Sequence, residues 1–424
     1  MSPGRGRPRL RHVLLDVSPL RDFPSYRLLW LGQSVNVIGN QVTRVALPYQ
    51  VYVLTHSTLA IAGLTVVQLV PLLLFSLAGG SLADAVDRRR LLIVTQIGLA
   101  STSGALVFVS IGGSPPVAVL YVIAAIAASF QAVDAPTRSS AVPRLVPPER
   151  LPAAIALGQL SFNAGSVIGP AIGGLILGTV GVAGAYAVDV VSFAVSILAI
   201  TALPAIPPLV AGSRAGLEAI REGLRYVRNR RVILSTFAID LNAMIFGFPS
   251  ALFPALALDV FRVGPLGVGL LNSAVAVGAF LGVAGSGSVT RIRRVGRGII
   301  VAVAVWGIAI ALFGLSTFSF PLALVFLAIA GAADVISAVL RSSVMQLSTP
   351  DELRGRVSAI NLLVVTSGPR IGDIEAAAVA SVIGAQLSAI SGGVLCLLGV
   401  LAVARAYPEL DRHERGATLE SEAA

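Results

Sequence analysis

The chain has 424 residues, of which 55% are hydrophobic and only 12% are charged. Soluble domains carry roughly a quarter charged residues, so a soluble protein of this length could not cover its surface with so little charge. The composition excludes the soluble, disordered, fibrous and disulfide-rich secreted classes and indicates a polytopic membrane protein. The single cysteine, Cys396, lies in an apolar run and cannot form an internal disulfide or a zinc or iron–sulfur site.

Apolar runs long enough to cross a membrane recur along the chain, since one membrane helix takes about 20–25 apolar residues. In chain order they predict helices at 27–53, 59–82, 91–112, 116–140, 152–178 and 182–204, and then at 232–259, 266–288, 298–317, 320–345, 357–383 and 386–406. The fold class expected is therefore an all-α membrane protein with twelve transmembrane helices in two six-helix halves. We expect cytosolic tails at 1–25 and 407–424, an N-terminal half at 26–204, a cytosolic central loop at 205–231 and a C-terminal half at 232–406.

Arginine supplies all 31 basic residues, and the net charge is +10. The arginines gather in the two tails, in the central loop and in the connections after the second, fourth, eighth and tenth runs, whereas Arg262 is alone on the opposite side. This is the positive-inside pattern, which predicts a multi-pass protein of the inner (cytoplasmic) membrane with both termini in the cytoplasm. The placement argues against a nucleic-acid partner, and the first 25 residues show no signal peptide.

Motifs for catalysis and for ATP binding are absent from the sequence. Because the chain contains no lysine, it cannot form the phosphate-binding loop that ends in Gly-Lys-Ser/Thr. Ser-hydrolase, zinc-protease and intact dinucleotide-binding patterns are also missing. We therefore expect no enzyme activity, no cofactor and no metal.

The turn between the second and third runs contains a motif of glycine, acids and arginines: Gly80, Asp84, Asp87, Arg88, Arg89 and Arg90. Gly80 allows close helix packing, and Asp84 stands at a helix end, where a carboxylate can cap a neighbouring helix or pair with arginine. The arginines would hold the turn at the cytosolic lipid surface. The segment resembles the conformational-gate signature of the major facilitator superfamily, although Ala85 and Asp87 depart from it. A plain positively charged turn is the alternative.

Two stretches repeat about 200 residues apart. Arg138-Ser139-Ser140 matches Arg341-Ser342-Ser343, and Gly169 to Gly174 matches Gly368 to Asp373. In the second copy Ala171 becomes Arg370 and Gly174 becomes Asp373. Duplicated transporters bind substrate near the midplane, between halves that rock around it.

The fifth run contains glycines four residues apart, which form one helix face for close packing, and a proline that can bend the helix. The motif consists of Gly165, Gly169, Pro170, Gly173 and Gly174. It is similar to the fifth-helix signature of antiporters in the major facilitator superfamily, which exporters carry. The resemblance implies the major facilitator fold and favours efflux.

Further segments are similar to the enterobactin-exporter branch of that superfamily: Thr55-His56-Ser57-Thr58, Leu252 to Leu256, Leu353 to Val357 and Gly372-Asp373. The resemblance implies a secondary active transporter, a proton-coupled exporter of a siderophore or similar amphipathic small molecule. Drug-efflux pumps for macrolides and tetracyclines share these features and stay an alternative, while a lipid flippase or an importer fits the motifs less well. The expected partners are the small-molecule substrate, protons and the lipid bilayer, and we expect a monomer because one chain contains both halves.

Charges inside membrane helices are costly and are functional candidates. The proton-coupling candidates are Asp373, Asp240, Asp189 and Glu375, since a carboxylate in a dry site can exchange a proton near neutral pH. Arg44 would bind an anionic group of the substrate, and other substrate-cavity candidates are Asn36, Asn40, Gln159, Asn163 and Asn242. Static pairing between helices is the alternative for these charges. Pairing within one helix is the alternative for Asp134 with Arg138 and for Asp334 with Arg341.

Overall fold

A computed structural model describes the chain at residues 16–207, 224–289 and 293–414. Side chains at 76–81, 83–84, 286–289 and 351–352 are outside this description. Most of the predicted N-terminal tail and parts of the predicted central loop and C-terminal tail therefore lie outside the described residues. Within those residues the chain is helical and contains no β-strand.

The helices before residue 208 form a first group. Their bounds are α1 Ser18–Asp22, α2 Pro24–Thr55, α3 Thr58–Ala85, α4 Arg88–Ile111, α5 Val117–Leu145, the short η2 Pro148–Arg150, α6 Leu151–Thr179 and α7 Gly181–Thr201. The turn from α2 to α3 shows how the sequence sets these bounds. His56 takes a left-handed conformation (φ 48°) that ends α2, and the Ser57 hydroxyl accepts from the Ala60 N–H to cap α3.

The helices after residue 230 form a second group. Their bounds are α9 Arg231–Phe246, η3 Ser250–Leu252, α10 Phe253–Ala255, η4 Leu256–Val260, α11 Gly264–Val289, α12 Val295–Leu315, α13 Phe320–Leu347, α14 Asp351–Ile383, α15 Ala385–Ala406 and α16 Pro408–Arg412. The predicted single helix at 232–259 is broken into four pieces, of which η4 is a π-helix. Pro249 and Pro254 lie at this break, and proline lacks the N–H that a continuous helix needs.

Ten of the described helical segments are long and apolar enough to cross a membrane. The two long helices that fall outside this set are α2 and α14, of 32 and 33 residues. They are less apolar because they contain the polar and charged residues predicted for the transport site, Arg44 on α2 and Asp373 on α14 among them. With these two, the described residues contain a long helical segment at each of the twelve predicted positions.

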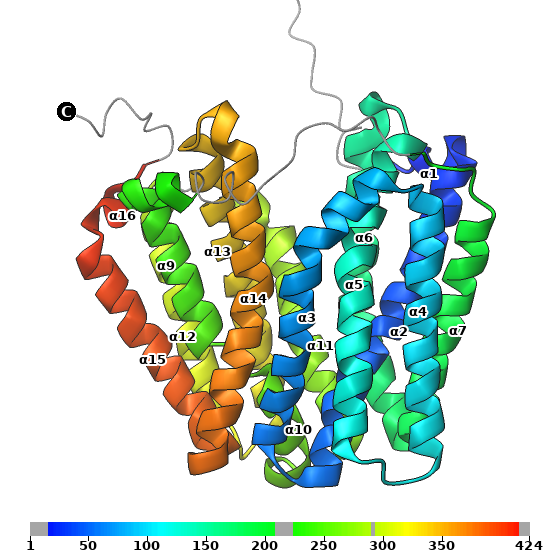
Figure 1. The fold of residues 1–424 in the computed structure, drawn as a ribbon. Coiled ribbons are helices and arrows are strands. Elements are labelled where there is room, and N and C mark those ends of the chain that lie inside the picture. The colour runs from blue at the N-terminus through cyan, green and yellow to red at the C-terminus, as the bar shows by residue number, and fades with distance from the viewer. Residues whose placement is uncertain (1–15, 208–223, 290–292, 415–424) are drawn as a thin grey trace, which may run out of the picture.

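Each group is packed mainly against itself. In the first group α2 packs on α6 and α7, α3 on α5, and α4 on α5 and α7. In the second group α13 packs on α11 and α12, and α15 packs on α12, α14 and α9. The groups meet where α3 contacts α14 and where α6 contacts α11 (Figure 1).

The two ends of the molecule differ. The arginine-rich end is the end at which α4, α9 and α12 begin, and Figure 1 shows it at the top. There α3 leans away from α14, whereas the two helices converge toward the other end. We call that other end the closed end, because Tyr52 donates a hydrogen bond to Asp259 and Thr58 donates to the Ala377 carbonyl (2.9 Å) across the two groups there.

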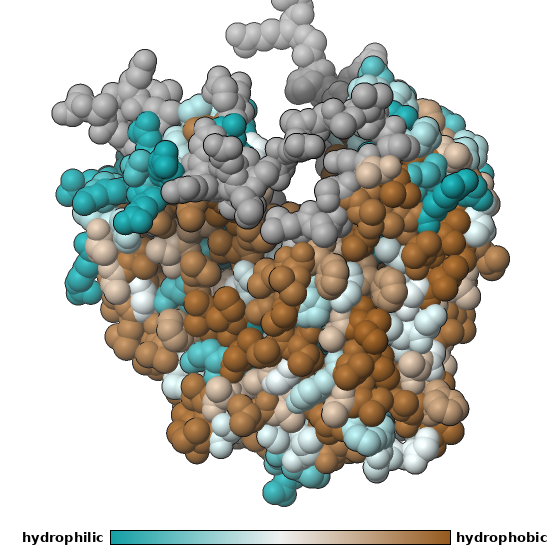
Figure 2. All heavy atoms as spheres, in the orientation of Figure 1, coloured by the Kyte–Doolittle hydropathy of each residue, from teal (hydrophilic) through white to brown (hydrophobic). Residues whose placement is uncertain are grey.

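The surface is apolar around its middle. Figure 2 shows hydrophobic residues over the central part of one face and hydrophilic residues gathered toward the arginine-rich end. Large apolar side chains point outward, such as Phe108 at 78% exposed and Leu198 at 70%. A contiguous apolar belt around long helices is the surface of a multi-pass membrane protein, in which lipid tails replace water.

Candidate functional site

A cavity of about 510 Å³ lies between the two groups, halfway along the helices. Helices of both groups line it, including α2, α3, α4, α5 and α7 from the first and α11 and α14 from the second. Its polar lining is Asn40, Thr43, Arg44, Thr65, Gln68, Thr102, Ser103, Gln131, Asp189, Ser250, Asn272, Thr366, Arg370 and Asp373. The remainder is mostly aliphatic, with Phe162 and Phe193 added. A pocket of this size and mixed lining suits an amphipathic small molecule.

Two arginines from opposite groups face this cavity. Arg44 comes from α2 and Arg370 from α14, and both act electrostatically on the Asp373 carboxylate and on each other. Within the described residues neither guanidinium group has a nitrogen within 4 Å of a carboxylate oxygen, so neither forms an ion pair. Two guanidinium groups near one carboxylate leave a local excess of positive charge. The pair can therefore bind an anionic or polar acceptor group that reaches both helix groups at once.

Asp373 also accepts hydrogen bonds in the wall of the cavity. Its Oδ1 accepts hydrogen bonds from the Ser250 hydroxyl (2.5 Å) and from the Ala251 N–H (2.9 Å). Both donors lie at η3, where the helix after α9 is broken. The carboxylate thus satisfies backbone that has no helical partner and ties α14 to the break.

Asp189 on α7 has a different environment. Its carboxylate accepts from the hydroxyls of Thr43 (2.9 Å) and Ser103 (2.8 Å), with Ser192 nearby at 3.4 Å. The residue is 2% exposed, and within the described residues it forms no ion pair. Gly39 permits this approach of α2, because a Cβ atom there would lie 2.9 Å from Asp189 Oδ1. Asp189 is a buried acid at the cavity with only neutral donors.

Asp240 lies outside the cavity lining and is paired. Arg341 Nη2 on α13 lies 2.8 Å from Asp240 Oδ1 on α9, and both side chains are under 10% exposed. Arg341 also donates to Ser337 (3.0 Å). Arg341 thus forms its ion pair with Asp240 on α9 and not with Asp334 on its own helix, although it also acts electrostatically on the buried Asp334 carboxyl group. This ion pair favours the static alternative for Asp240 over a proton-coupling role.

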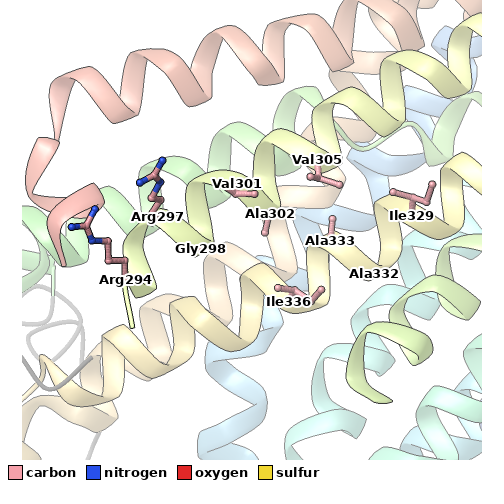
Figure 3. Close-up of a pocket in the computed structure, with 10 residues that line it drawn as sticks. All are labelled: Arg294, Arg297, Gly298, Val301, Ala302, Val305, Ile329, Ala332, Ala333 and Ile336. Atoms are coloured by element: carbon pink, nitrogen blue, oxygen red, sulfur yellow. The ribbon is translucent and has the colours of Figure 1, made fainter. Parts of the chain in front are cut away.

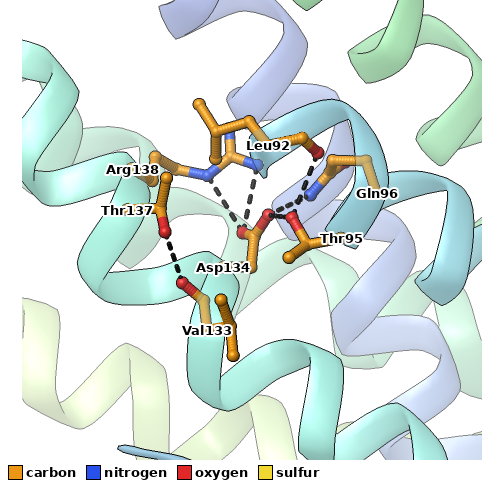
Figure 4. Close-up of polar contacts among 7 residues, drawn as sticks. All are labelled: Leu92, Thr95, Gln96, Val133, Asp134, Thr137 and Arg138. Carbon is orange, nitrogen blue, oxygen red and sulfur yellow. Dashed lines mark hydrogen bonds and ion pairs between the residues drawn. The ribbon is translucent and has the colours of Figure 1, made fainter. Parts of the chain in front are cut away.

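The alternative of pairing within one helix is confirmed for Asp134 and Arg138. Arg138 Nη2 lies 3.2 Å from Asp134 Oδ2, one helical turn away on α5. Figure 4 shows the other carboxylate oxygen accepting from Thr95 (2.8 Å) and Gln96 (2.9 Å) on α4. The ion pair lies within α5 and the two hydrogen bonds join α5 to α4, so this network holds two helices of one group together.

Several predicted cavity residues lie elsewhere. Of the six substrate-cavity candidates, only Asn40 and Arg44 line the cavity. Asn242 donates to the Cys396 carbonyl (2.9 Å) and joins α9 to α15, because an amide inside a membrane must find a partner. The remaining candidates, Asn36, Gln159 and Asn163, and the proton-coupling candidate Glu375 are not among the lining residues; Gln159 donates to Asn163 (3.0 Å) along the α6 surface.

Sequence reasoning missed the role of Arg370 and most of the neutral lining. Arg370 replaces an alanine of the first repeat, and this substitution was the available signal. The contacts of Thr43 and Ser103 with Asp189 could not be predicted from the sequence. Hydroxyl residues are common in membrane helices, and only the folded structure shows which of them point into a cavity.

The predicted gate motif is partly described. Asp87 caps α4 by accepting from the Arg90 N–H (3.0 Å). The expectation that the arginines hold the turn at the lipid surface is wrong for Arg88, which is 2% exposed and donates to Ser140 (3.0 Å). Arg89 donates to the Thr201 carbonyl (2.5 Å) at the end of α7, where unpaired carbonyls attract cations. Gly80 and Asp84 lie on α3 among the residues whose side chains are not described.

The glycines of the fifth-helix motif all lie at close contacts. Gly165, Gly169 and Gly173 face α2, and a Cβ atom at Gly173 would lie 3.1 Å from the Val42 Cα. Gly174 faces the other group, because a Cβ atom there would lie 3.0 Å from the Gly269 Cα on α11. Pro170 is part of the same contact, since its carbonyl lies against Gly269.

A mid-depth cavity between two groups of membrane helices defines the class of a secondary transporter. The transmembrane secretion effector model of the major facilitator superfamily matches residues 16–421. The chain therefore belongs to the transmembrane secretion effector family, and it is a multi-pass membrane transporter.

Two relatives match nearly the whole chain. The enterobactin exporter EntS of Shigella boydii serotype 18 is 28% identical over 394 residues, which are 92% of this chain and 93% of the relative. EntS of Escherichia coli O139:H28 matches to the same extent.

Solved structures share the major facilitator fold. A bacterial homologue of the lysosomal transporter Spinster superposes with a TM-score of 0.68 at 18% identity, over 92% of this chain and 98% of that one. A bacterial homologue of the iron transporter ferroportin gives 0.68 at 15% identity, over 92% and 99%. These likenesses show that the all-α, two-group architecture predicted from the sequence is the major facilitator fold.

Proposed function

We propose that this protein exports a siderophore or a similar amphipathic compound across the cytoplasmic membrane in exchange for protons. The observation that supports it most is the pair Arg44 and Arg370, which face one cavity from opposite groups without an ion-pair partner in the described residues. The naming of the relatives as enterobactin exporters supports the siderophore class. Substrate that bridges the two arginines would draw the two groups together around it.

The arginine-rich end is proposed to be cytoplasmic, with both termini on that side, by the positive-inside rule. The closed end then faces outward, and the structure corresponds to a conformation that accepts substrate from the cytoplasm. The halves predicted at 26–204 and 232–406 would rock around the cavity as units, which opens the closed end in the alternate conformation.

Asp189 is proposed as the group that exchanges the proton. Its described partners are neutral hydroxyls, so it can gain and lose a proton without breaking an ion pair. Asp373, by contrast, lies near both arginines and fastens the break at η3. We assign Asp373 to balancing the charge of the arginine pair.

The substrate is tested by secretion under iron limitation. Cells that lack the protein are complemented with the unmodified chain, with Arg44→Gln, with Arg370→Gln or with Arg144→Gln, and secreted siderophores are measured by mass spectrometry. Arg144 is an exposed arginine at the end of α5, so its variant controls for loss of surface charge. Loss of secretion in the two cavity variants alone supports the proposal. Unchanged secretion without the protein refutes the siderophore and turns the search to macrolides and tetracyclines.

Proton exchange is tested in vesicles with Asp189→Asn. We expect uptake driven by a pH gradient to be lost, while exchange of labelled for unlabelled substrate continues, because exchange needs binding and rocking without net proton movement. Full gradient-driven uptake would contradict the assignment. Loss of both activities would show that Asp189 serves binding or folding instead.

A further inference from the structure

A second hollow, of about 550 Å³, lies between α12 and α13 and is separate from the transport cavity. We call it the α12–α13 groove. Figure 3 shows its lining residues on α12 and α13 and on the residue just before α12, with two arginines together at one end: Arg294, Arg297, Gly298, Val301, Ala302, Val305, Ile329, Ala332, Ala333 and Ile336. All lining residues other than the arginines are apolar.

Small residues create the depth of this groove. Ala302 and Ala333 are 7% and 5% exposed and leave space between the helices. Larger side chains stand beside them, with Val301 54% exposed and Ile329 42% exposed. Because the groove opens on the apolar belt of a membrane protein, its natural filling is a hydrocarbon chain.

The length of the groove fits one leaflet. Arg297 and Val305 are eight residues apart on α12, which corresponds to about 12 Å along the helix axis. One leaflet supplies half of a hydrocarbon core about 30 Å thick, or about 15 Å. The groove therefore runs from headgroup level to near the midplane.

The charge at its mouth is positive. Arg297 is exposed and forms no ion pair with an acid in the described residues. Arg294 lies 3.7 Å from Glu414, and both side chains are 60% exposed. Such a surface pair is weak and can yield to a better anion. A phosphate group at the two arginines would complete a site that is apolar along the groove and cationic at its mouth.

We propose that the α12–α13 groove binds one anionic phospholipid from the leaflet at the arginine-rich end, with its phosphate at Arg294 and Arg297 and one acyl chain along the groove. Basic clefts between membrane helices are suited to such headgroups. The site does not depend on the identity of the exported compound, and it would fasten α12 to α13 within the second group.

Native mass spectrometry of the purified full-length protein tests the proposal, with phosphatidylglycerol compared with phosphatidylcholine of the same acyl chains. We expect one tightly retained phosphatidylglycerol. Arg294→Gln combined with Arg297→Gln should weaken it about 25-fold, since each basic residue at an anionic headgroup is worth about a factor of five. Ala333→Leu should also weaken it by filling the groove, whereas Arg144→Gln at the same end of the molecule should leave it unchanged.

Equal retention of the two lipids, or equal phosphatidylglycerol binding by the double arginine variant, would overturn the proposal. An equal loss in Arg144→Gln would also overturn it, because it would show general attraction to a basic surface. Gel filtration and thermal unfolding check that each variant is folded. If Ala333→Leu fails to fold, the double arginine variant alone decides.

Discussion

Gly174 on α6 is the position where a single methyl group should change the conformation of the transporter. A Cβ atom there would lie 3.0 Å from the Gly269 Cα and 3.0 Å from the carbonyl oxygens of Leu266 and Pro265. All three atoms are backbone of the other group, so they cannot turn aside. Overpacking of this kind costs about 1–3 kcal/mol. The cost arises only while α6 and α11 are in contact.

Gly174→Ala should therefore shift the equilibrium away from the structure described here by a factor of about 5 to 150. Spin labels on cysteines placed at His56 and Ser381, which are exposed near the closed end in opposite groups, would report the distance between the groups. Cys396 is fully buried, so it should not take up the label. We expect a longer distance to gain population in Gly174→Ala.

Two neighbouring glycines provide matched controls. A Cβ atom at Gly178, one turn along the same helix, would meet nothing within 4 Å, so Gly178→Ala should leave the distances unchanged. Gly173→Ala would strain the contact with α2, inside one group, and should lower stability without changing the distance. A distance distribution in Gly174→Ala identical to that of Gly178→Ala would refute the reasoning that this contact keeps the end closed.

Polar contacts at the two ends of the molecule lead to three more predictions. Tyr52→Phe removes a hydrogen bond to a carboxylate, worth about 1.5–3 kcal/mol, and should lengthen the same spin-label distance; an unchanged distance would show that this bond does not hold the closed end. Arg88→Ala leaves buried partners unsatisfied and should lower thermal stability by about 2–4 kcal/mol, whereas exposed Arg90→Ala should have little effect, and equal melting of the two variants would contradict this. Arg231 holds the pKa of Glu409 below its ordinary value of 4.5, so docking of α16 should be intact above about pH 4.5 and weaken as pH falls through the lowered value; hydrogen exchange of residues 409–412 checks this, with Arg231→Gln reducing the pH dependence.

The helices were predictable because each one follows from local sequence. Apolar runs of membrane length gave all twelve spans, and the run at 357–383 ends where α14 ends. The break after α9 was missed, although Pro249 and Pro254 were its signals, because hydropathy alone does not distinguish a continuous helix from a broken one. Proline within α2 and α6 did not interrupt those helices.

The direction of polar faces was harder to predict. Gln159 and Asn163 do share a face, as their spacing of four indicates, but helical periodicity does not say whether a face points into a cavity or along a surface. Asp134 and Arg138 could be paired from spacing because they lie on one helix. Asp240 and Arg341 could not, because their ion pair depends on how α9 and α13 pack.

One position of the sequence repeat has a different structural role in each of its two copies. Gly174 and Asp373 are equivalent in the sequence repeat, on α6 and α14. Without a side chain, Gly174 lets the backbones of the two groups touch, whereas Asp373 holds the break at η3 and lies beside Arg44 and Arg370. A carboxylate at 174 could not fit against α11, and a glycine at 373 would leave the Ala251 N–H without its acceptor. Of these two equivalent helices, α14 therefore contributes charge to the site and α6 contributes close packing, so substitutions at the two positions should separate effects on substrate binding from effects on conformation.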